Sequence, residues 1–396
     1  MEAYALDWVQ LVIRWVHLIT GIAWIGASFY FVFLDNSLLP PKSKDDAGAG
    51  AGVSGELWAI HGGGFYHAQK YPVAPATLPE PLHWFKWEAY WTWMSGFALF
   101  VVMYYAHAEL YMIDRSVADI ASWQAIAISA ALLVVGWIFY DQLCKRAGLD
   151  REAVVGIVMI AFLAIVAWGL SHVFSGRAMY MQVGAMMGTI MACNVFFVIM
   201  PSQRKLIEAK EHGIAPDPVY GLRGKQRSVH NNYFTLPVLF IMISNHYPMT
   251  FGHKHAWLIL AAVLLIAAYV RHFFNLRHKG RTVWTIPVTA AAATLALAVV
   301  IAPDKPKPAP FTFAEVQQIV AERCATCHAA KPTQAGFNEA PKGVVLDTPA
   351  LIVANAQKIN EQSVMTKAMP IGNLTGMTDA ERATLGAWIA AGAPSK

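Results

Sequence analysis

Five consecutive residues near the end of the chain have the types and spacing to hold an iron porphyrin: Cys324, Ala325, Thr326, Cys327 and His328. In such a C-x-x-C-H pattern the two thiols can bond to the vinyl groups of a haem, since the spacer sets them about one helical turn apart. His328 then faces the iron as its proximal ligand. Half of a zinc site or a redox dithiol is the alternative, but no second Cys pair completes a zinc site. The pattern predicts one covalent c-type haem.

The segments next to this pattern are those that a haem-binding domain needs. Phe313–Arg323 reads as a short amphipathic helix that leads into the first thiol. The iron needs a sixth ligand, commonly Met. Met369 is the best candidate, because the proline that follows it cannot donate a backbone hydrogen bond and holds the loop extended. Met365 and Met377 are the alternatives, with gap filling in a small core as their other interpretation.

Local sequence signals also predict the last helix of the chain. Thr378 and Glu381 form a capping box, and Leu385 and Trp388 belong to the apolar stripe that follows. A helix before the thiols, a methionine loop and a closing helix resemble a class I cytochrome c domain. The resemblance covers residues 311–396.

Composition places the rest of the chain in lipid. Hydrophobic residues make up 56% of it and charged residues only 14%, whereas a soluble domain carries about 25% charge. Apolar runs of roughly 20 residues, long enough to span a bilayer, lie at Trp8–Leu34, Tyr90–His107, Ser122–Leu143, Ala153–His172, Met181–Met200, Tyr233–Tyr247, Ala256–Phe274 and Val283–Ile301. We therefore expect an all-α fold: a polytopic bundle of about eight transmembrane helices at 1–301, a Pro-rich linker at 302–310 and the small cytochrome domain at 311–396.

Loop charge predicts the orientation of this bundle. Lys and Arg gather in the loops after the third, fifth and seventh spans, among them Arg146, Arg223 and Arg271. Cytoplasmic loops carry this excess, so both termini and the cytochrome domain are expected on the periplasmic side of a bacterial inner membrane. Covalent attachment of c-type haem, which bacteria carry out in the periplasm, agrees. The net charge of +5 arises in these loops, and we expect no nucleic-acid partner.

Ionisable side chains inside the predicted spans are costly in lipid and usually functional. His17, His107, His172 and His246 lie in the periplasmic halves of their spans, and two histidines on facing helices at one depth can hold a b-type haem. Arg14, one turn from His17, could neutralise a haem propionate. We expect one or two b-type haems, without a fixed ligand pair. A single histidine can equally be a hydrogen-bonded or snorkelling residue.

The long connection at residues 35–89 is dense in histidine and aromatic residues in its second part. His61 and His67 flank a run with three glycines, and His83 and Glu88 lie among tryptophans. We expect this segment to fold back onto the cytoplasmic face of the bundle, either in a substrate role or as an interfacial aromatic belt. A substrate bound there would be separated from the c-type haem by a hydrocarbon core about 30 Å thick, which would require an electron carrier inside the bundle.

Several motifs taken together resemble the bacterial membrane-integral urate oxidases. They are the runs His61–His67, Leu82–Glu88 and Ser228–Tyr233, the later Ser244–Pro248, and the C-terminal cytochrome pattern. The resemblance covers essentially the whole chain. It implies oxidation of urate to 5-hydroxyisourate with electrons passing to the cytochrome rather than to oxygen, so that no hydrogen peroxide forms. A soluble cytochrome c or a terminal oxidase would accept the electrons next.

Urate chemistry is compatible with these residues. Urate is a planar monoanion at neutral pH, so aromatic side chains can stack on it and Lys86 or a cationic histidine can hold its charge. A general base must take up protons, and the candidates are His61, His67, His83, His230 and Glu88. Two other functions stay open: a membrane dehydrogenase for quinol or another small reductant with the same haem wiring, and a non-enzymatic electron-transfer protein. The oligomeric state is not predicted.

Overall fold

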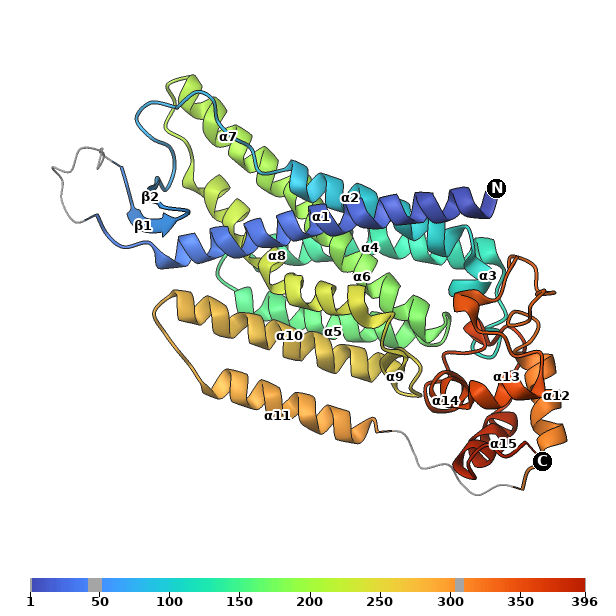
Figure 1. Ribbon diagram of the computed structural model, residues 1–396. Helices are drawn as coiled ribbons and strands as arrows, with labels where there is room; N and C mark the ends of the chain where they lie inside the picture. Colours follow the sequence, from blue (N-terminus) through green and yellow to red (C-terminus); the bar gives the residue numbers. More distant parts are fainter. Residues whose placement is uncertain (1, 42–51, 303–309, 396) are drawn as a thin grey trace.

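The computed structural model describes residues 2–41, 52–302 and 310–395, which form a long helical bundle with a smaller helical unit at one end (Figure 1). The bundle consists of α1 (Glu2–Ser37), α2 (Trp87–Phe100), α3 (Ala108–Tyr111), α4 (Ser122–Ala147), α5 (Glu152–Leu170), α6 (Gly176–Cys193), α7 (Met200–Glu211), α8 (Pro218–Ser244), α9 (Pro248–Phe251), α10 (Ala256–His278) and α11 (Thr285–Val300). The C-terminal unit consists of α12 (Phe313–Arg323), α13 (Pro349–Ala354), α14 (Ala356–Ile359) and α15 (Asp379–Ala390). Two strands, β1 (Gly55–His61) and β2 (Gly64–Lys70), complete the fold.

Five helical segments of the described chain are long and apolar enough to cross a membrane. They are Tyr4–Ser37, Ser122–Ala147, Glu152–Leu170, Gly176–Glu211 and Ala256–His278. The fourth joins α6 to α7 through a π-helical stretch, Asn194–Ile199. The other three predicted spans are also helical, but they are shorter or more polar and correspond to α2, α8 and α11. The chain has the make-up of a multi-pass membrane protein, and the count of eight spans stays a prediction.

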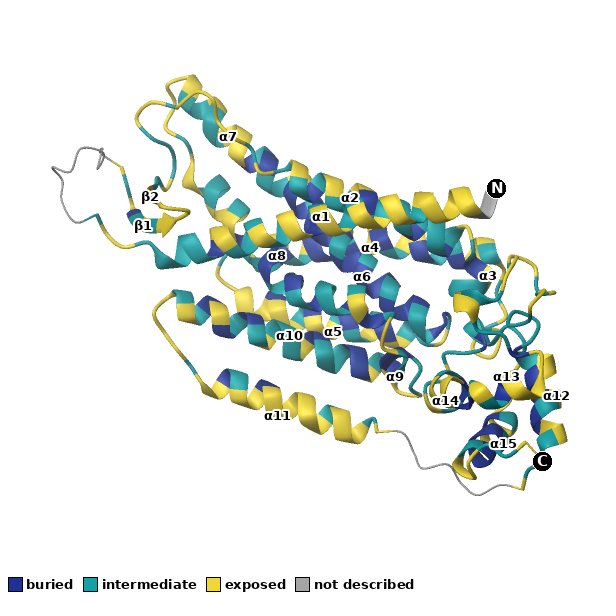
Figure 2. Ribbon diagram, viewed as in Figure 1, coloured by how far each residue is buried: buried dark blue, intermediate teal, exposed yellow. Residues whose placement is uncertain are grey.

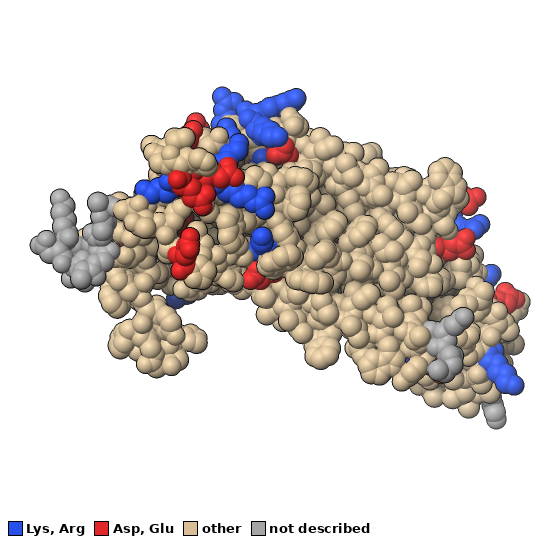
Figure 3. All heavy atoms as spheres, turned by 90° about the horizontal axis from the view of Figure 1, so that it is seen from above, with Lys and Arg blue, Asp and Glu red and all other residues tan. Residues whose placement is uncertain are grey.

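The surface of the bundle fits a lipid environment. Seen from above, charged side chains gather toward the two ends of the molecule, and the face between them is largely without charge (Figure 3). Large apolar side chains such as Trp15, Ile22 and Val288 are exposed, and most of α11 and the first half of α1 lie on the outside (Figure 2). Exposure of such apolar surfaces to water is unfavourable, whereas their contact with lipid tails is not.

The core of the bundle is built around α6, most of whose residues are buried. Two glycines let its neighbours approach closely. A Cβ added at Gly136 of α4 would lie 2.5 Å from Met186, and one added at Gly184 of α6 would lie 2.5 Å from Ile241 of α8. Small residues at such crossings are what helix packing in lipid requires, because close backbone contact replaces the hydrophobic effect there.

The prediction of an all-α fold is wrong for residues 55–70, which form an antiparallel hairpin. Its turn contains Gly62 and Gly63, whose φ angles of +57° and +83° favour glycine. The glycine run is therefore a turn. Lys70 and Lys225 both pair with Asp35 at the end of α1, so the segment does fold back onto the bundle. The hairpin lies at the end opposite the C-terminal unit (Figure 1); the low-complexity stretch at 42–51 lies outside the described residues.

The C-terminal unit has a hydrophobic core of its own, which includes Val316, Val320, Leu385 and Trp388. The predicted helix Phe313–Arg323 is confirmed as α12, and the capping box that opens α15 is confirmed as well. The unit packs against α3, and it lies at the same end of the molecule as the start of α1 (Figure 1). Most of the predicted Pro-rich linker, residues 303–309, falls outside the described residues.

Candidate functional site

The two thiols of the C-x-x-C-H pattern lie on a single backbone turn that follows α12. The amide of Cys327 donates to the carbonyl of Cys324 (3.2 Å), and the amide of His328 donates to the same carbonyl (2.9 Å). Burial raises the pKa of the Cys324 thiol to about 12, whereas redox dithiols and zinc sites depend on stabilised thiolates. Among the described residues no three His, Cys, Asp or Glu side chains group as a metal site. The raised pKa of Cys324 is the opposite of what a reactive thiolate needs.

The imidazole of His328 is oriented by the backbone. Its Nδ1 lies 2.9 Å from the carbonyl oxygen of Val344. A carbonyl can only accept, so Nδ1 carries the proton and Nε2 keeps its lone pair. Iron-binding histidines are commonly held in this way. The residues present thus fit a covalently attached haem with His328 as one axial ligand.

The three candidate methionines have different surroundings. The backbone of Met369 is fixed, because the buried Arg382 donates from Nη1 to its carbonyl (2.8 Å) and also to the carbonyl of Ser363. Met377 is 3% exposed and belongs to the hydrophobic core, whereas Met365 is 45% exposed. The fixed loop supports Met369 as the sixth ligand, which stays a prediction.

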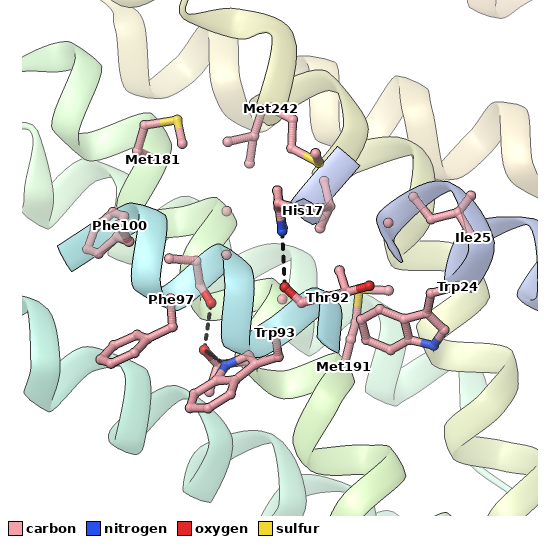
Figure 4. A pocket seen from close by; sticks show the side chains of 18 of the residues that line it. His17, Trp24, Ile25, Thr92, Trp93, Phe97, Phe100, Met181, Met191 and Met242 are labelled. Carbon is pink, nitrogen blue, oxygen red and sulfur yellow. Dashed lines mark hydrogen bonds between the residues drawn. The ribbon is translucent and has the colours of Figure 1, made fainter. Parts of the chain in front are cut away.

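A large apolar cavity lies in the bundle between α1, α2, α4, α6 and α8 (Figure 4). We call it the His17 cavity; its volume is about 890 Å³, including the part open at its mouth. Nδ1 of His17 lies 3.0 Å from the carbonyl oxygen of Thr92, so Nε2 is again left with its lone pair. The lining of the His17 cavity includes four glycines and three methionines: Gly21, Gly96, Gly184, Gly188, Met181, Met191 and Met242. One imidazole nitrogen and several thioethers are groups that can bind haem iron, whereas Gly96 and Gly184 make room for His17 and Ile241 rather than for a ligand.

The other residues predicted for b-type haem lie elsewhere. His107 precedes α3, and His172 and His246 are exposed in the turns after α5 and α8. Arg14 is exposed on α1, with Nη2 2.8 Å from the sulfur of Met103. None of the four lines the His17 cavity, so the structure does not bring the predicted bis-histidine group together there.

A polar belt surrounds the middle of α8, at His230, Asn231, Asn232 and Tyr233. Successive helical residues are about 100° apart, so each of these side chains reaches a different part of the surrounding bundle. Asn231 accepts from Asn194 (2.8 Å), Asn232 accepts from Arg271 (2.7 Å), and the hydroxyl of Tyr233 lies 2.7 Å from Nδ1 of His272. The run Ser228–Tyr233 thus ties α8 to the helices around it.

The five predicted general bases are not gathered in one place. His61, His67 and His83 are exposed on the hairpin and on the loop before α2, and His67 stacks on Trp58 with a ring distance of 4.1 Å. Glu88 lies in the first turn of α2. Only His230 lies in the polar belt.

His230 is held at both ring nitrogens. Its Nδ1 is 2.7 Å from the hydroxyl of Tyr140, and its Nε2 is 2.6 Å from Oε2 of Glu152. The side chain of His230 is only 11% exposed, whereas that of Glu152 is 49% exposed. The pair therefore connects the buried belt to the surface, which suits proton transfer better than the isolated histidines of the hairpin.

A second cavity opens beside the polar belt, between α1, α8 and α10. It is lined by Phe29, Tyr30, Phe33, Leu236, Arg271, Phe274 and His278, and we call it the Arg271 cavity. Its volume is about 700 Å³, part of it open to the outside. The prediction that Arg271 lies in a cytoplasmic loop is wrong, because this residue lies inside α10 and is 3% exposed. The sequence does contain a signal for a buried Arg271: this arginine lies inside a predicted apolar span, where a charged side chain is usually functional.

Comparison with known proteins agrees with the bundle. The family model described as "Urate oxidase N-terminal" matches residues 3–302. This is most of the chain, and the chain belongs to that family. The match covers the bundle and the hairpin and ends before α12. Searches of curated proteins and of solved structures give no match.

Proposed function

We propose that this member of the urate oxidase N-terminal family oxidises urate to 5-hydroxyisourate in the membrane and delivers the electrons to its own C-terminal unit. Membership of the family over residues 3–302 carries the proposal. The orientation of His328 by Val344 supports the second part, because it prepares an iron ligand outside the matched region. A soluble cytochrome c or a terminal oxidase would accept the electrons from there, and hydrogen peroxide would not form.

The reaction balances without oxygen. The urate monoanion and one water give neutral 5-hydroxyisourate, one proton and two electrons. Bound haem would supply the one-electron acceptors: a c-type haem held by Cys324, Cys327 and His328, and a b-type haem for which His17 offers an axial nitrogen. The part of the protein is to hold the anion, to admit one water and to remove the proton.

His230 and Glu152 are suited to remove that proton. Tyr140 can donate to Nδ1 of His230 while Nε2 donates to Glu152. Both ring nitrogens are occupied, so Tyr140 would take up the proton while it passes its own proton to Nδ1. Nε2 would then give its proton to Glu152, whose partly exposed carboxyl can release it to solvent. Of the predicted bases, His230 is therefore the one we assign to the reaction.

The test is anaerobic addition of urate to the purified, oxidised full-length protein. We expect the c-type haem absorption bands to change to those of the reduced form, with 5-hydroxyisourate as the product and no hydrogen peroxide after oxygen is readmitted. Reduction by a quinol and not by urate would instead identify a different membrane dehydrogenase. Absence of reduction by either compound would leave only a non-enzymatic electron-transfer protein.

A further inference from the structure

Arg271 is a buried cation for which the described residues offer no anionic partner. Its Nε donates to Asn232 (2.7 Å), and its guanidinium carbon lies 4.0 Å from the ring centre of Phe29. Its Nη2 is buried and has no hydrogen-bond partner among the described residues. The ion pairs found in the described parts of the chain do not include Arg271. Such a group is costly to bury unless an anion joins it.

A second polar atom beside this arginine is also without a partner. His278 lines the same cavity and has a buried Nδ1 with no hydrogen-bond partner among the described residues. Arg271 and His278 are seven residues apart on α10 and thus lie on one face, two turns apart. A ligand that lies between them can accept from the arginine and exchange a second hydrogen bond with the imidazole.

The walls of the Arg271 cavity favour a flat ligand. Phe29 stacks on the arginine, and Phe33 meets the ring of His278 edge-on at 5.2 Å. Phe274 and Tyr30 add further ring surface. Flat aromatic walls around one fixed cation suit a planar anionic heterocycle better than a tetrahedral phosphate, because ring stacking adds to the charge-assisted hydrogen bonds.

We propose that the Arg271 cavity binds the planar purine anion that is oxidised, with Arg271 as its anchor. This inference rests on the proposed function and adds the location of the substrate. Ile25 lines the His17 cavity and Phe29 lines the Arg271 cavity, so the two cavities are one helical turn, about 6 Å, apart along α1. The polar belt that holds His230 adjoins the arginine through Asn232. The two cavities thus share α1 and α8 as walls, whereas His230 points to another side of α8, toward Tyr140 and Glu152.

The residues of α1 that line the cavity lie near the end of that helix, and this end of α1 is at the hairpin end of the molecule, far from the C-terminal unit (Figure 1). Substrate would therefore enter at the end where Lys70 and Lys225 also lie, and these cations would attract an anion. The exposed histidines of the hairpin would be part of the approach to the site rather than of the reaction.

The test compares Arg271→Gln with Arg277→Gln in the full-length protein. Arg277 is exposed on the same helix, so its variant controls for the loss of one positive charge. We measure binding of radiolabelled urate to the fully reduced protein, which cannot oxidise it, and kcat and KM for urate-dependent reduction of an external cytochrome c. Arg271→Gln should raise Kd and KM by about tenfold or more, since hydrogen bonds to charged groups are lost. Arg277→Gln should stay within about twofold.

Two further variants keep the test decisive if Arg271→Gln does not fold. Arg271→Lys keeps the charge but loses the planar fork, and Phe33→Ala removes one wall; each should raise KM for urate without loss of covalent haem. If the wild type oxidises urate and all three variants keep its KM, the site is elsewhere and the proposed function stands. If the wild type neither binds nor oxidises urate, both proposals fail. Loss of a co-purified anionic phospholipid in Arg271→Gln, with KM unchanged, would identify a lipid site and overturn the inference.

Discussion

Two histidines in different parts of the molecule are prepared in the same way. His17 and His328 each have Nδ1 at about hydrogen-bond distance from a backbone carbonyl, 3.0 Å to Thr92 and 2.9 Å to Val344. In each, Nε2 is left with its lone pair. The surroundings differ. His328 lies on the backbone turn that directly follows the two thiols, in the C-terminal unit, whereas His17 faces a cavity formed by five helices.

The two sites also differ in the sequence separation of the residues that form them. The partner of His328 is 16 residues away, and the partner of His17 is 75 residues away. A covalent site needs two thiols and a histidine close together in sequence, and the pattern is then readable. A non-covalent site depends on the rotation of each helix about its axis, which no short motif specifies.

Removal of the two thiols should have the largest effect. In Cys324→Ala with Cys327→Ala, haem can no longer be bonded, so haem staining after denaturing electrophoresis should disappear completely. Urate-dependent reduction of an external cytochrome c should fall by about two orders of magnitude or more. Cys193→Ala, which changes a cysteine of the bundle, is the control and should keep the stain. Retained staining in the double variant would refute the covalent site.

His17→Ala should separate the two sites. It removes the nitrogen that would hold the proposed b-type haem, so we expect the haem released by acid acetone to be lost while the covalent haem remains. Transfer of electrons from urate to the covalent haem should slow by at least about tenfold. The control is His172→Ala, because His172 is exposed and lies outside the cavity. Equal haem loss in both variants would restore the predicted bis-histidine pair.

The sequence predicted the features that depend on neighbouring residues. The limits of α12 and the capping box of α15 follow from local spacing, and the structure confirms both. The hairpin was missed, although two short runs around Gly62 and Gly63 are a signal for one. The histidines of this segment predicted a substrate role or an aromatic belt instead.

The candidate site was predicted less well, because burial in the bundle is a tertiary property. Arg271 was counted with the loop cations that predict orientation, but α10 continues to His278 and α1 and α8 cover the arginine. Depth along a helix can be read from the sequence, and it correctly placed His17 inside the bundle. It could not show that His107, His172 and His246 face away from the cavity.

Gly96→Ala should have a smaller effect on the same cavity. A Cβ at this position of α2 would lie 2.7 Å from Cε1 of His17, so the imidazole must shift, at a cost of about 1–3 kcal/mol. We expect partial loss of the non-covalent haem, or a changed reduction potential, measured by redox titration. Gly156→Ala on α5, where a Cβ would meet nothing within 4 Å, should change neither. An unchanged potential and haem content in Gly96→Ala would show that the position of His17 is not critical.

Acid should weaken the C-terminal unit at α15, through the carboxylate of Glu381. Burial alone would raise the pKa of Glu381, but hydrogen bonds from Thr378 and Arg323 outweigh it and leave the pKa below 4.5. The lowered pKa stabilises the folded state above that value, and the contribution is lost as pH falls through it. Glu381→Gln should therefore increase hydrogen exchange of α15 amides at pH 7 roughly fivefold, for a loss of about 1 kcal/mol.

The difference between Glu381→Gln and the wild type should shrink as the pH falls through the lowered pKa of Glu381, because its side chain then loses the charge that the glutamine lacks. Glu315→Gln, which removes the equivalent capping box of α12, should change exchange in α12 and leave α15 as it is. A constant ratio of exchange rates from pH 7 to 3.5 would mean that the carboxylate charge does not stabilise α15. If amides of α6 changed in step with those of α15, the two histidine sites would belong to one cooperative unit, and the contrast between a local and an assembled site would not extend to their stability.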